Sequence, residues 1–362
     1  MDRFPNPEDL DATSIPHPFF EKMTEELREQ AKTGNDPPPA FENHAGVKQG
    51  RAGRSALLDA TYGESPSGVK ETVREIPMRD GFQSNIRIYQ PAKAVEGGSP
   101  VVMLSFGGGF AGENRAPGPY ARGLVQLYGA VVINISYRLA PENPFPTSIN
   151  DAWDSFNWIA KNASSLGGNP SKGFVLGGIS AGGNISAVVT QNAVEQNFSP
   201  PITGVWLQVP IVFPGPDQVP DKYKAFFKSR DQNAVVPVLS LRSMQGVDRM
   251  LKPDLDSKWY SPFNAENPHK GIPPTYIQVN GMDPLRDDGV IYEKVLREHG
   301  TKTRLTVWPG LPHAHCSFFP KEEFSKSAVR DTIKGFGWLL DKPEAEDQAI
   351  DNAVAPAPSA GG

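Results

Sequence analysis

The chain has 362 residues, of which 38% are hydrophobic and 21% are charged, an ordinary globular composition that can build one large core. Its formal net charge of -5 and pI near 5.8 argue against nucleic acid or an anionic membrane as the main partner. The one cysteine, Cys316, excludes an intrachain disulfide and is compatible with a reducing compartment. Because the sequence shows neither a signal-peptide core nor about 18 consecutive apolar residues without a charge, we expect a cytoplasmic protein with no membrane span.

The first 60 residues are expected to form an N-terminal cap segment. Residues 1–16 are polar and rich in proline. A helix is predicted to follow and to stop at Gly34, with an apolar face made of Phe19, Phe20, Met23, Leu27 and Ala31. Residues 35–61 are rich in proline, glycine and alanine, and we expect them to be irregular.

Residues 61–342 are expected to form the main domain. Residues 73–78 and 83–89, separated by a turn at 79–81, predict an antiparallel hairpin. Short, nearly continuous apolar runs then predict strands buried on both faces, at residues 101–106, 130–136, 174–179, 205–209, 276–279 and 305–308. Helical patterns separate most of them, at residues 120–128, 148–163, 183–195 and 288–299. This alternation predicts an α/β fold with a mostly parallel central sheet flanked by helices.

Two segments depart from the alternation. Residues 211–262 are too apolar for a solvated loop and too irregular for a strand–helix unit, so we expect a cap insert over the carboxyl edge of the sheet. The alternative is a peripheral helical insertion with no role in binding. Residues 343–362 are rich in proline, alanine, serine and glycine and are expected to form a disordered tail.

The sharpest local signal is the sequence Gly-Ile-Ser-Ala-Gly at residues 178–182. It lies between a predicted strand and a predicted helix, the context in which a GxSxG turn exposes a nucleophilic serine. An ordinary glycine–serine turn is the alternative. The context favours Ser180 as a nucleophile.

A glycine run, Gly107-Gly108-Gly109, follows the first buried strand. Backbone N–H groups of Gly107, Gly108 and Ala181 could there stabilise a developing oxyanion. The run also matches the dinucleotide pattern GxGxxG through Gly112. That alternative requires a helix directly after Gly112 and an acid at the end of the next strand. Prolines instead interrupt the segment where the helix should lie, and Ser-Tyr-Arg occupies the end of the strand.

A serine hydroxyl needs a base, and the base needs an orienting acid. Asp283 follows the predicted strand 276–279, where a strand-end carboxylate is required. Asp287 and Asp288 lie at a helix start, where acids are commonly caps. His313 and His315 both follow the last predicted strand, and we favour His313 as the base, with His315 as the alternative.

The chain resembles the hormone-sensitive-lipase-like carboxylesterases of the α/β-hydrolase fold, over roughly residues 73–340. The resemblance depends on ordered motifs at residues 106–110, 137–146, 180–184, 283–287 and 312–313. It implies a triad of Ser180, Asp283 and His313, oxyanion donors on Gly107, Gly108 and Ala181, an N-terminal helical cap, and no cofactor or metal.

Two positions differ from the family pattern. Phe106 stands where the oxyanion loop begins with histidine, and Ile179 stands where an acid precedes the serine. A phenyl ring cannot make the hydrogen bond by which histidine would brace the loop, so the loop needs another brace, and packing of Phe106 is the one we expect. The alternative is that the Phe106 side chain faces the pocket and shapes a site for a reaction other than hydrolysis.

We therefore expect a serine hydrolase that cleaves carboxylic esters of small or medium acyl chain through an acyl-enzyme, acting as a monomer or homodimer. One alternative is a hydrolase-fold enzyme repurposed for lactonisation, acyl transfer or cyclisation. The other is a non-catalytic ligand-binding receptor, which the intact serine, acid and histidine argue against.

Overall fold

The computed structural model describes residues 4, 6–34, 44–61 and 63–355. In this part of the chain eight strands form one sheet, in the order β1-β2-β4-β3-β5-β6-β7-β8. The strands are β1 (Val69–Pro77), β2 (Gln83–Pro91), β3 (Val101–Ser105), β4 (Val131–Ile135), β5 (Phe174–Ile179), β6 (Gly204–Gln208), β7 (Thr275–Met282) and β8 (Thr303–Pro312). β2 pairs antiparallel with β1 and β4, and all later neighbours pair in parallel. The predicted fold class is confirmed.

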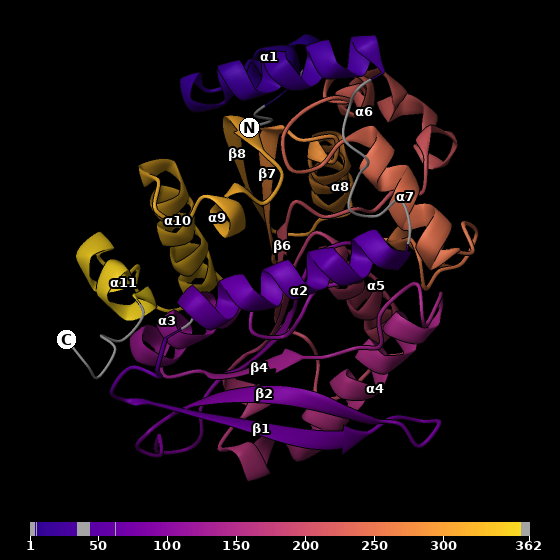
Figure 1. Ribbon diagram of the computed structural model, residues 1–362. Helices are drawn as coiled ribbons and strands as arrows, with labels where there is room; N and C mark the ends of the chain where they lie inside the picture. The colour runs from indigo at the N-terminus through magenta and orange to yellow at the C-terminus, as the bar shows by residue number, and fades with distance from the viewer. Residues whose placement is uncertain (1–3, 5, 35–43, 62, 356–362) are drawn as a thin grey trace, which may run out of the picture.

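Two layers of helices cover the sheet (Figure 1). The apolar side chains that alternate along the central strands supply a separate core for each layer. One layer consists of α4 (Thr147–Asn162), α5 (Ala181–Glu195) and α8 (Arg286–Glu298). The other consists of α3 (Gly118–Tyr128), α10 (Glu323–Leu339) and α11 (Asp347–Val354). Short elements complete the connections: η2 (Ala163–Leu166), η3 (Pro170–Lys172) and α9 (His315–Phe318).

The helix that the sequence predicts before Gly34 is present. After η1 (Pro7–Ser14), α1 (Pro18–Thr33) begins at the N-cap His17 and ends at Gly34, whose φ of 70° is left-handed, a conformation in which glycine avoids a Cβ clash. Figure 1 shows α1 over the ends of β7 and β8. Its Phe20 is fully buried there against Met282 and Leu311, whereas Phe19 remains partly exposed.

The expectation that residues 35–61 are irregular is wrong for the second half. Residues 44–61 form α2 (His44–Thr61), and residues 35–43 lie outside the described part of the chain. The three glycines of α2 weaken helix propensity, but the helix docks through its arginines: Arg51 bonds Glu142 at 2.9 Å, and Arg54 donates to the carbonyl of Ala111 at 3.3 Å. Tertiary contacts therefore outweigh composition here.

The segment between β6 and β7 holds short helices and little regular structure. They are η4 (Pro216–Gln218), η5 (Asp221–Phe226), α6 (Ser229–Gln232), α7 (Leu241–Leu251) and η6 (Pro262–Asn264). Two acids at the start of α8 fasten this insert, because Asp287 accepts the backbone N–H of Ser229 at 2.6 Å and Asp288 that of Val212 at 3.0 Å. These acids bind the insert rather than cap their own helix.

The expected disorder of residues 343–362 is wrong for residues 347–354, which form α11 on the surface of α3. Ile350 and Ala353 are buried there, and Arg330 pairs with Asp351 at 2.7 Å. Residues 356–362 lie outside the described part. Among the described helices, none combines the length and the apolar character that crossing a membrane requires.

Candidate active site

Three side chains from separate loops meet at the carboxyl end of the sheet. The Oγ of Ser180 lies 2.9 Å from Nε2 of His313, and Nδ1 of His313 lies 2.7 Å from Oδ2 of Asp283. Ser180 follows β5, Asp283 follows β7 and His313 follows β8, so the parallel strands bring together residues as many as 133 positions apart. All three are buried. This arrangement can move a proton from a serine hydroxyl to an imidazole.

Ser180 is held in a strained turn between β5 and α5. Its φ and ψ are 57° and -117°, and its N–H donates to the carbonyl of Gln208 at 2.8 Å. A Cβ on Gly182 would lie 2.1 Å from the carbonyl oxygen of Ser105, so only glycine permits this approach. The predicted strand–turn–helix context of Ser180 is confirmed.

The carboxylate of Asp283 is oriented by the chain around it. Its Oδ1 accepts the N–H of Leu285 at 2.9 Å, which leaves Oδ2 for His313. In addition, the side-chain amide of Asn233, in the insert, donates to the carbonyls of Gly281 and Asp283, each at 3.1 Å. Asn233 was not predicted, because no local motif in the sequence marks it.

His315, the alternative base, points into the protein. Its ring lies edge-on to Phe324 and Trp308, and its Nε2 is 3.4 Å from Sγ of Cys316. Burial lowers the pKa of His315 to about 4, so the ring is neutral at pH 7. Within the described structure, the ring of His315 makes no hydrogen bond to Ser180, whereas His313 bonds both Ser180 and Asp283.

The glycine loop lies beside Ser180, and Phe106 packs under it. Phe106 is buried and stacks on Tyr137 with ring centroids 4.2 Å apart, while the Tyr137 hydroxyl donates to the carbonyl of Phe106 at 2.7 Å. Phe106 therefore packs in the core beneath the loop and is absent from the described cavity wall. The expected packing of Phe106 in the core is therefore observed, its bracing role stays a prediction, and Tyr137 is a partner that the sequence did not indicate.

The amides of Gly107, Gly108 and Ala181 donate no hydrogen bond within the described part of the chain. All three residues line the same cavity as Ser180 and His313. The N–H of Ala181 also lies in the first turn of α5, where the helix dipole favours negative charge. No helix follows Gly112 directly, since α3 begins at Gly118, so the dinucleotide pattern lacks its structural context.

The cavity has a volume of about 150 Å³ and a largely apolar wall. The helix α2 contributes Leu58 and Arg54, and the insert contributes Leu239, Met244 and Val247. The N-terminal segment and the insert therefore both contribute to the cavity in which Ser180 lies.

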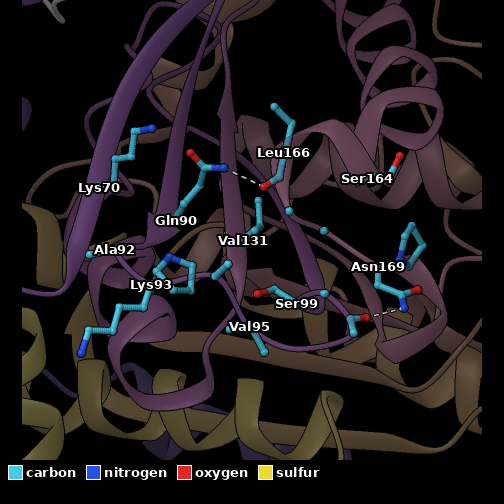
Figure 2. Close-up of a pocket in the computed structure, with 17 residues that line it drawn as sticks. Lys70, Gln90, Ala92, Lys93, Val95, Ser99, Val131, Ser164, Leu166 and Asn169 are labelled. Atoms are coloured by element: carbon cyan, nitrogen blue, oxygen red, sulfur yellow. Dashed lines mark hydrogen bonds between the residues drawn. The ribbon is translucent and has the colours of Figure 1, made fainter.

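A second, larger hollow of about 600 Å³ lies at the amino ends of the parallel strands, far from Ser180 in the fold (Figure 2). Its polar groups are already bonded to each other in part: Gln90 donates to the carbonyl of Leu166 at 2.7 Å, and Asn169 to that of Gly97 at 2.8 Å. Its described wall contains no histidine, aspartate or glutamate that could serve a serine as base or acid.

The fold and this site define a class of protein. A family model described as "alpha/beta hydrolase fold" matches residues 102–317, more than half of the chain. The chain belongs to this α/β-hydrolase family, in its hormone-sensitive-lipase-like carboxylesterase branch, and is a carboxylic ester hydrolase that acts on small-molecule esters.

Individual relatives agree with this assignment. An AB hydrolase superfamily protein of Schizosaccharomyces pombe is 34% identical, covering 91% of this chain and 97% of its own. Carboxylesterase NlhH of Mycobacterium tuberculosis is 33% identical over 64% of this chain and 71% of its own. Among solved structures, vibralactone cyclase has a TM-score of 0.78 at 28% identity, covering 91% of this chain and 96% of its own. A thermostable esterase of Pseudomonas putida has a TM-score of 0.73 at 25% identity, covering 91% and 99%.

Proposed function

We propose that the protein hydrolyses esters of small or medium acyl chain through an acyl-enzyme on Ser180. The observation that carries the proposal is the continuous hydrogen-bonded chain from Ser180 through His313 to Asp283, at 2.9 and 2.7 Å, beside three backbone amides with free donors in the described structure. Such a chain serves nucleophilic catalysis, and the amides suit an oxyanion.

In the first half-reaction, Oγ of Ser180 attacks the ester carbonyl carbon while Nε2 of His313 takes the hydroxyl proton. The carbonyl oxygen becomes an oxyanion, which the amides of Gly107, Gly108 and Ala181 stabilise. The C–O bond to the alcohol then breaks, and His313 gives its proton to the departing alkoxide. Asp283 stabilises the imidazolium and fixes its orientation.

In the second half-reaction, water takes the place of the alcohol. His313 accepts a proton from water as its oxygen attacks the acyl carbon, and the tetrahedral intermediate collapses to the carboxylic acid and free Ser180. The net reaction adds one water across the ester bond.

The size of the cavity supports the chain-length limit. A space of about 150 Å³ with an apolar wall suits a short hydrocarbon chain rather than a long one. The test is a series of p-nitrophenyl esters from acetate to palmitate, for which we expect kcat/KM to peak at short or medium acyl chains. A peak at palmitate would contradict the chain-length limit.

Cyclisation is the second candidate, favoured by the similarity to vibralactone cyclase. In a cyclisation, a hydroxyl of the substrate itself would attack the acyl carbon in place of water and close a lactone. Turnover of p-nitrophenyl acetate or butyrate decides between the two. A rate equal to that of the Ser180→Ala variant would refute the simple esterase and favour the cyclase. The predicted cytoplasmic location and the monomeric or homodimeric state stay predictions.

A further inference from the structure

Backbone strain gathers around the cavity that contains Ser180. Nine non-glycine residues of the described chain have a positive φ, and four of them line this cavity: Phe110, Ser180, Val238 and Ala314. Ser180 is the proposed nucleophile, and Phe110 and Ala314 adjoin the glycine loop and the base. Val238, in the insert between α6 and α7, adjoins none of these groups. Its strain therefore needs a different explanation.

Val238 is the central residue of a γ-turn. Its φ is 72°, and the N–H of Leu239 donates to the carbonyl of Pro237 at 3.0 Å, which closes a turn of three residues. A γ-turn with a positive φ at its centre is rare and strained, and glycine is the residue that adopts such a φ without a steric cost. A β-branched residue is among the least suited, because its Cβ and methyl groups crowd the backbone.

The chain on both sides holds this turn in place. Before the turn, Val236 is buried in the cluster that includes Phe20. After it, the N–H of Leu241 donates to the carbonyl of Ala234 at 3.0 Å, where α7 begins. A strained residue persists where the surrounding structure over-determines its conformation. The direction of the Cα–Cβ bond of Val238 is therefore fixed.

The side chain of Val238 is half-buried and forms part of the cavity wall. The cavity has a volume of about 150 Å³, so an isopropyl group in its wall occupies space that a longer hydrocarbon chain would need. Glycine at this position would relieve the strain and widen the cavity. Valine instead destabilises the turn and narrows the space beside Ser180, and strained positions of this kind are typical of ligand-binding sites.

We propose that Val238 is a specificity-determining residue, which limits the length of the hydrocarbon chain that an ester substrate can place in the cavity. The γ-turn holds the isopropyl group in the wall, and the hydrocarbon chain of the substrate ends against it. This inference rests on the proposed function of Ser180 and deepens it, because it assigns the limit to short or medium chains to one residue.

Two substitutions of Val238 test the limit. Val238→Ala and Val238→Gly both remove the methyl groups, so longer chains should fit. The ratio of kcat/KM for p-nitrophenyl octanoate to that for the butyrate reports on the acyl chain, and the ratio for octyl butyrate to ethyl butyrate reports on the alcohol chain. In both variants we expect one of these ratios to rise about ten-fold over the wild type, because an added methylene that fits an apolar pocket changes kcat/KM by this order.

The control for specificity is Val235→Ala. Val235 lies in the same loop but is not part of the described cavity wall, so this variant should keep both wild-type ratios. Fluorophosphonate labelling of Ser180 in each variant corrects for any loss of folded protein.

The melting temperatures of the variants test the strain separately. At an ordinary position glycine is less stable than alanine, whereas at a φ of 72° alanine keeps a Cβ that glycine lacks. Val238→Gly should therefore melt at a higher temperature than Val238→Ala. Leu239, the next residue, lines the same cavity without a positive φ, so Leu239→Gly should melt at a lower temperature than Leu239→Ala.

Unchanged ratios in both Val238 variants would overturn the inference while short esters are still hydrolysed and Ser180 is still labelled. A lower melting temperature for Val238→Gly than for Val238→Ala would overturn it as well, because the turn would then not be strained. If no ester is hydrolysed and Ser180 is not labelled, the proposed function fails first, and the inference fails with it.

Discussion

The ring of Phe106 stacks on that of Tyr137 with 15° between their planes, and the Tyr137 hydroxyl donates to the Phe106 carbonyl at 2.7 Å. Phe106 directly precedes Gly107, so Tyr137 holds the base of the glycine loop through both a ring contact and a hydrogen bond. In the related family a histidine occupies the position of Phe106. Here the brace comes from packing in the core.

The Tyr137–Phe106 pair predicts a specific kinetic effect. Tyr137→Phe keeps the stack but removes the hydroxyl, leaving a buried carbonyl unsatisfied, at a cost of about 1–3 kcal/mol. If that cost loosens the loop, kcat for p-nitrophenyl butyrate should fall about ten-fold with little change in KM, because the loop acts on the oxyanion. A rise of about ten-fold in KM with unchanged kcat would contradict the bracing role.

Substitution of Phe106 itself separates packing from chemistry. Phe106→Ala opens a cavity under the loop and should lower kcat and melting temperature together, with a loss of about 3–5 kcal/mol in stability. Phe106→His restores the family residue and should retain or raise activity on simple esters. Negligible ester activity in Phe106→His would indicate that this position serves another reaction.

Ser180→Ala should abolish fluorophosphonate labelling and ester turnover while the circular dichroism spectrum stays that of the wild type. The reason is that the hydroxyl is the group bonded to His313, whereas its removal leaves the backbone bond to Gln208 in place. Ser317→Ala is the control, since Ser317 lines the same cavity without a bond to His313. Labelling that persists in Ser180→Ala would show that another residue is the nucleophile.

The two histidines after β8 should respond differently. His313→Ala should lower kcat by about three to four orders of magnitude, as for loss of a triad base. His315→Ala should affect the melting temperature more than kcat, because its ring packs against Trp308 and Phe324. Steady-state kinetics and thermal unfolding of both variants provide the comparison. The opposite ranking of kcat would assign the base to His315.

The sequence predicted best what is buried on two faces or fixed by a local motif. The continuous apolar run at residues 174–179 coincides with β5. The strand predicted at 305–308 is longer in the structure, as β8 (Thr303–Pro312). Pro309 and Gly310 interrupt the apolar pattern, and the pairing with β7 shifts its register there before it resumes at Pro312. The helices α2 and α11 were missed because their stability comes from docking, which composition does not report.

The same distinction applies to the candidate site: residues that directly follow strands were predictable, and residues that act across the fold were not. Ser180, Asp283 and His313 each follow a strand, so chain order and parallel topology suffice to bring them together. Asn233, in the irregular insert, and Tyr137, in a neighbouring loop, act across the fold, and their partners lie 50 and 31 residues away. Nothing in local spacing indicates such contacts.

Two buried histidines predict acid sensitivity. Burial, reinforced by His299, lowers the pKa of His269 to about 3, and burial lowers that of His315 to about 4. Both values lie below the ordinary value of 6.5, so the unfolded chain binds more protons than the folded one. Their stabilising contribution is therefore complete above pH 6.5 and is lost as the pH falls toward 4 and 3.

Each histidine should cost about 1 kcal/mol in the free energy of unfolding on going from pH 6.5 to 5.5, because the unfolded histidine is already half protonated at pH 6.5. Urea unfolding at a series of pH values measures this loss. His269→Gln removes one of the two titrations and should make the loss between pH 6.5 and 5.5 smaller by about half. An unchanged slope in that variant would show that His269 does not contribute.

Arg286 joins the N-terminal segment, the insert and α8 from a fully buried position. Its guanidinium donates to the carbonyl of Leu10 at 3.0 Å and to Gln232 at 2.8 Å, and it pairs with Asp287 at 2.7 Å. Arg286→Met leaves Asp287 buried without its cation, so the free energy of unfolding should fall by about 3–5 kcal/mol. Lys222→Met, which breaks an exposed pair with Glu298, is the control and should cost less than about 1 kcal/mol. Because Arg286 also lies three residues after Asp283, the Arg286→Met variant should lose kcat beyond its loss of folded protein, as measured per labelled Ser180. Equal urea midpoints for the two variants would contradict the anchoring role of Arg286.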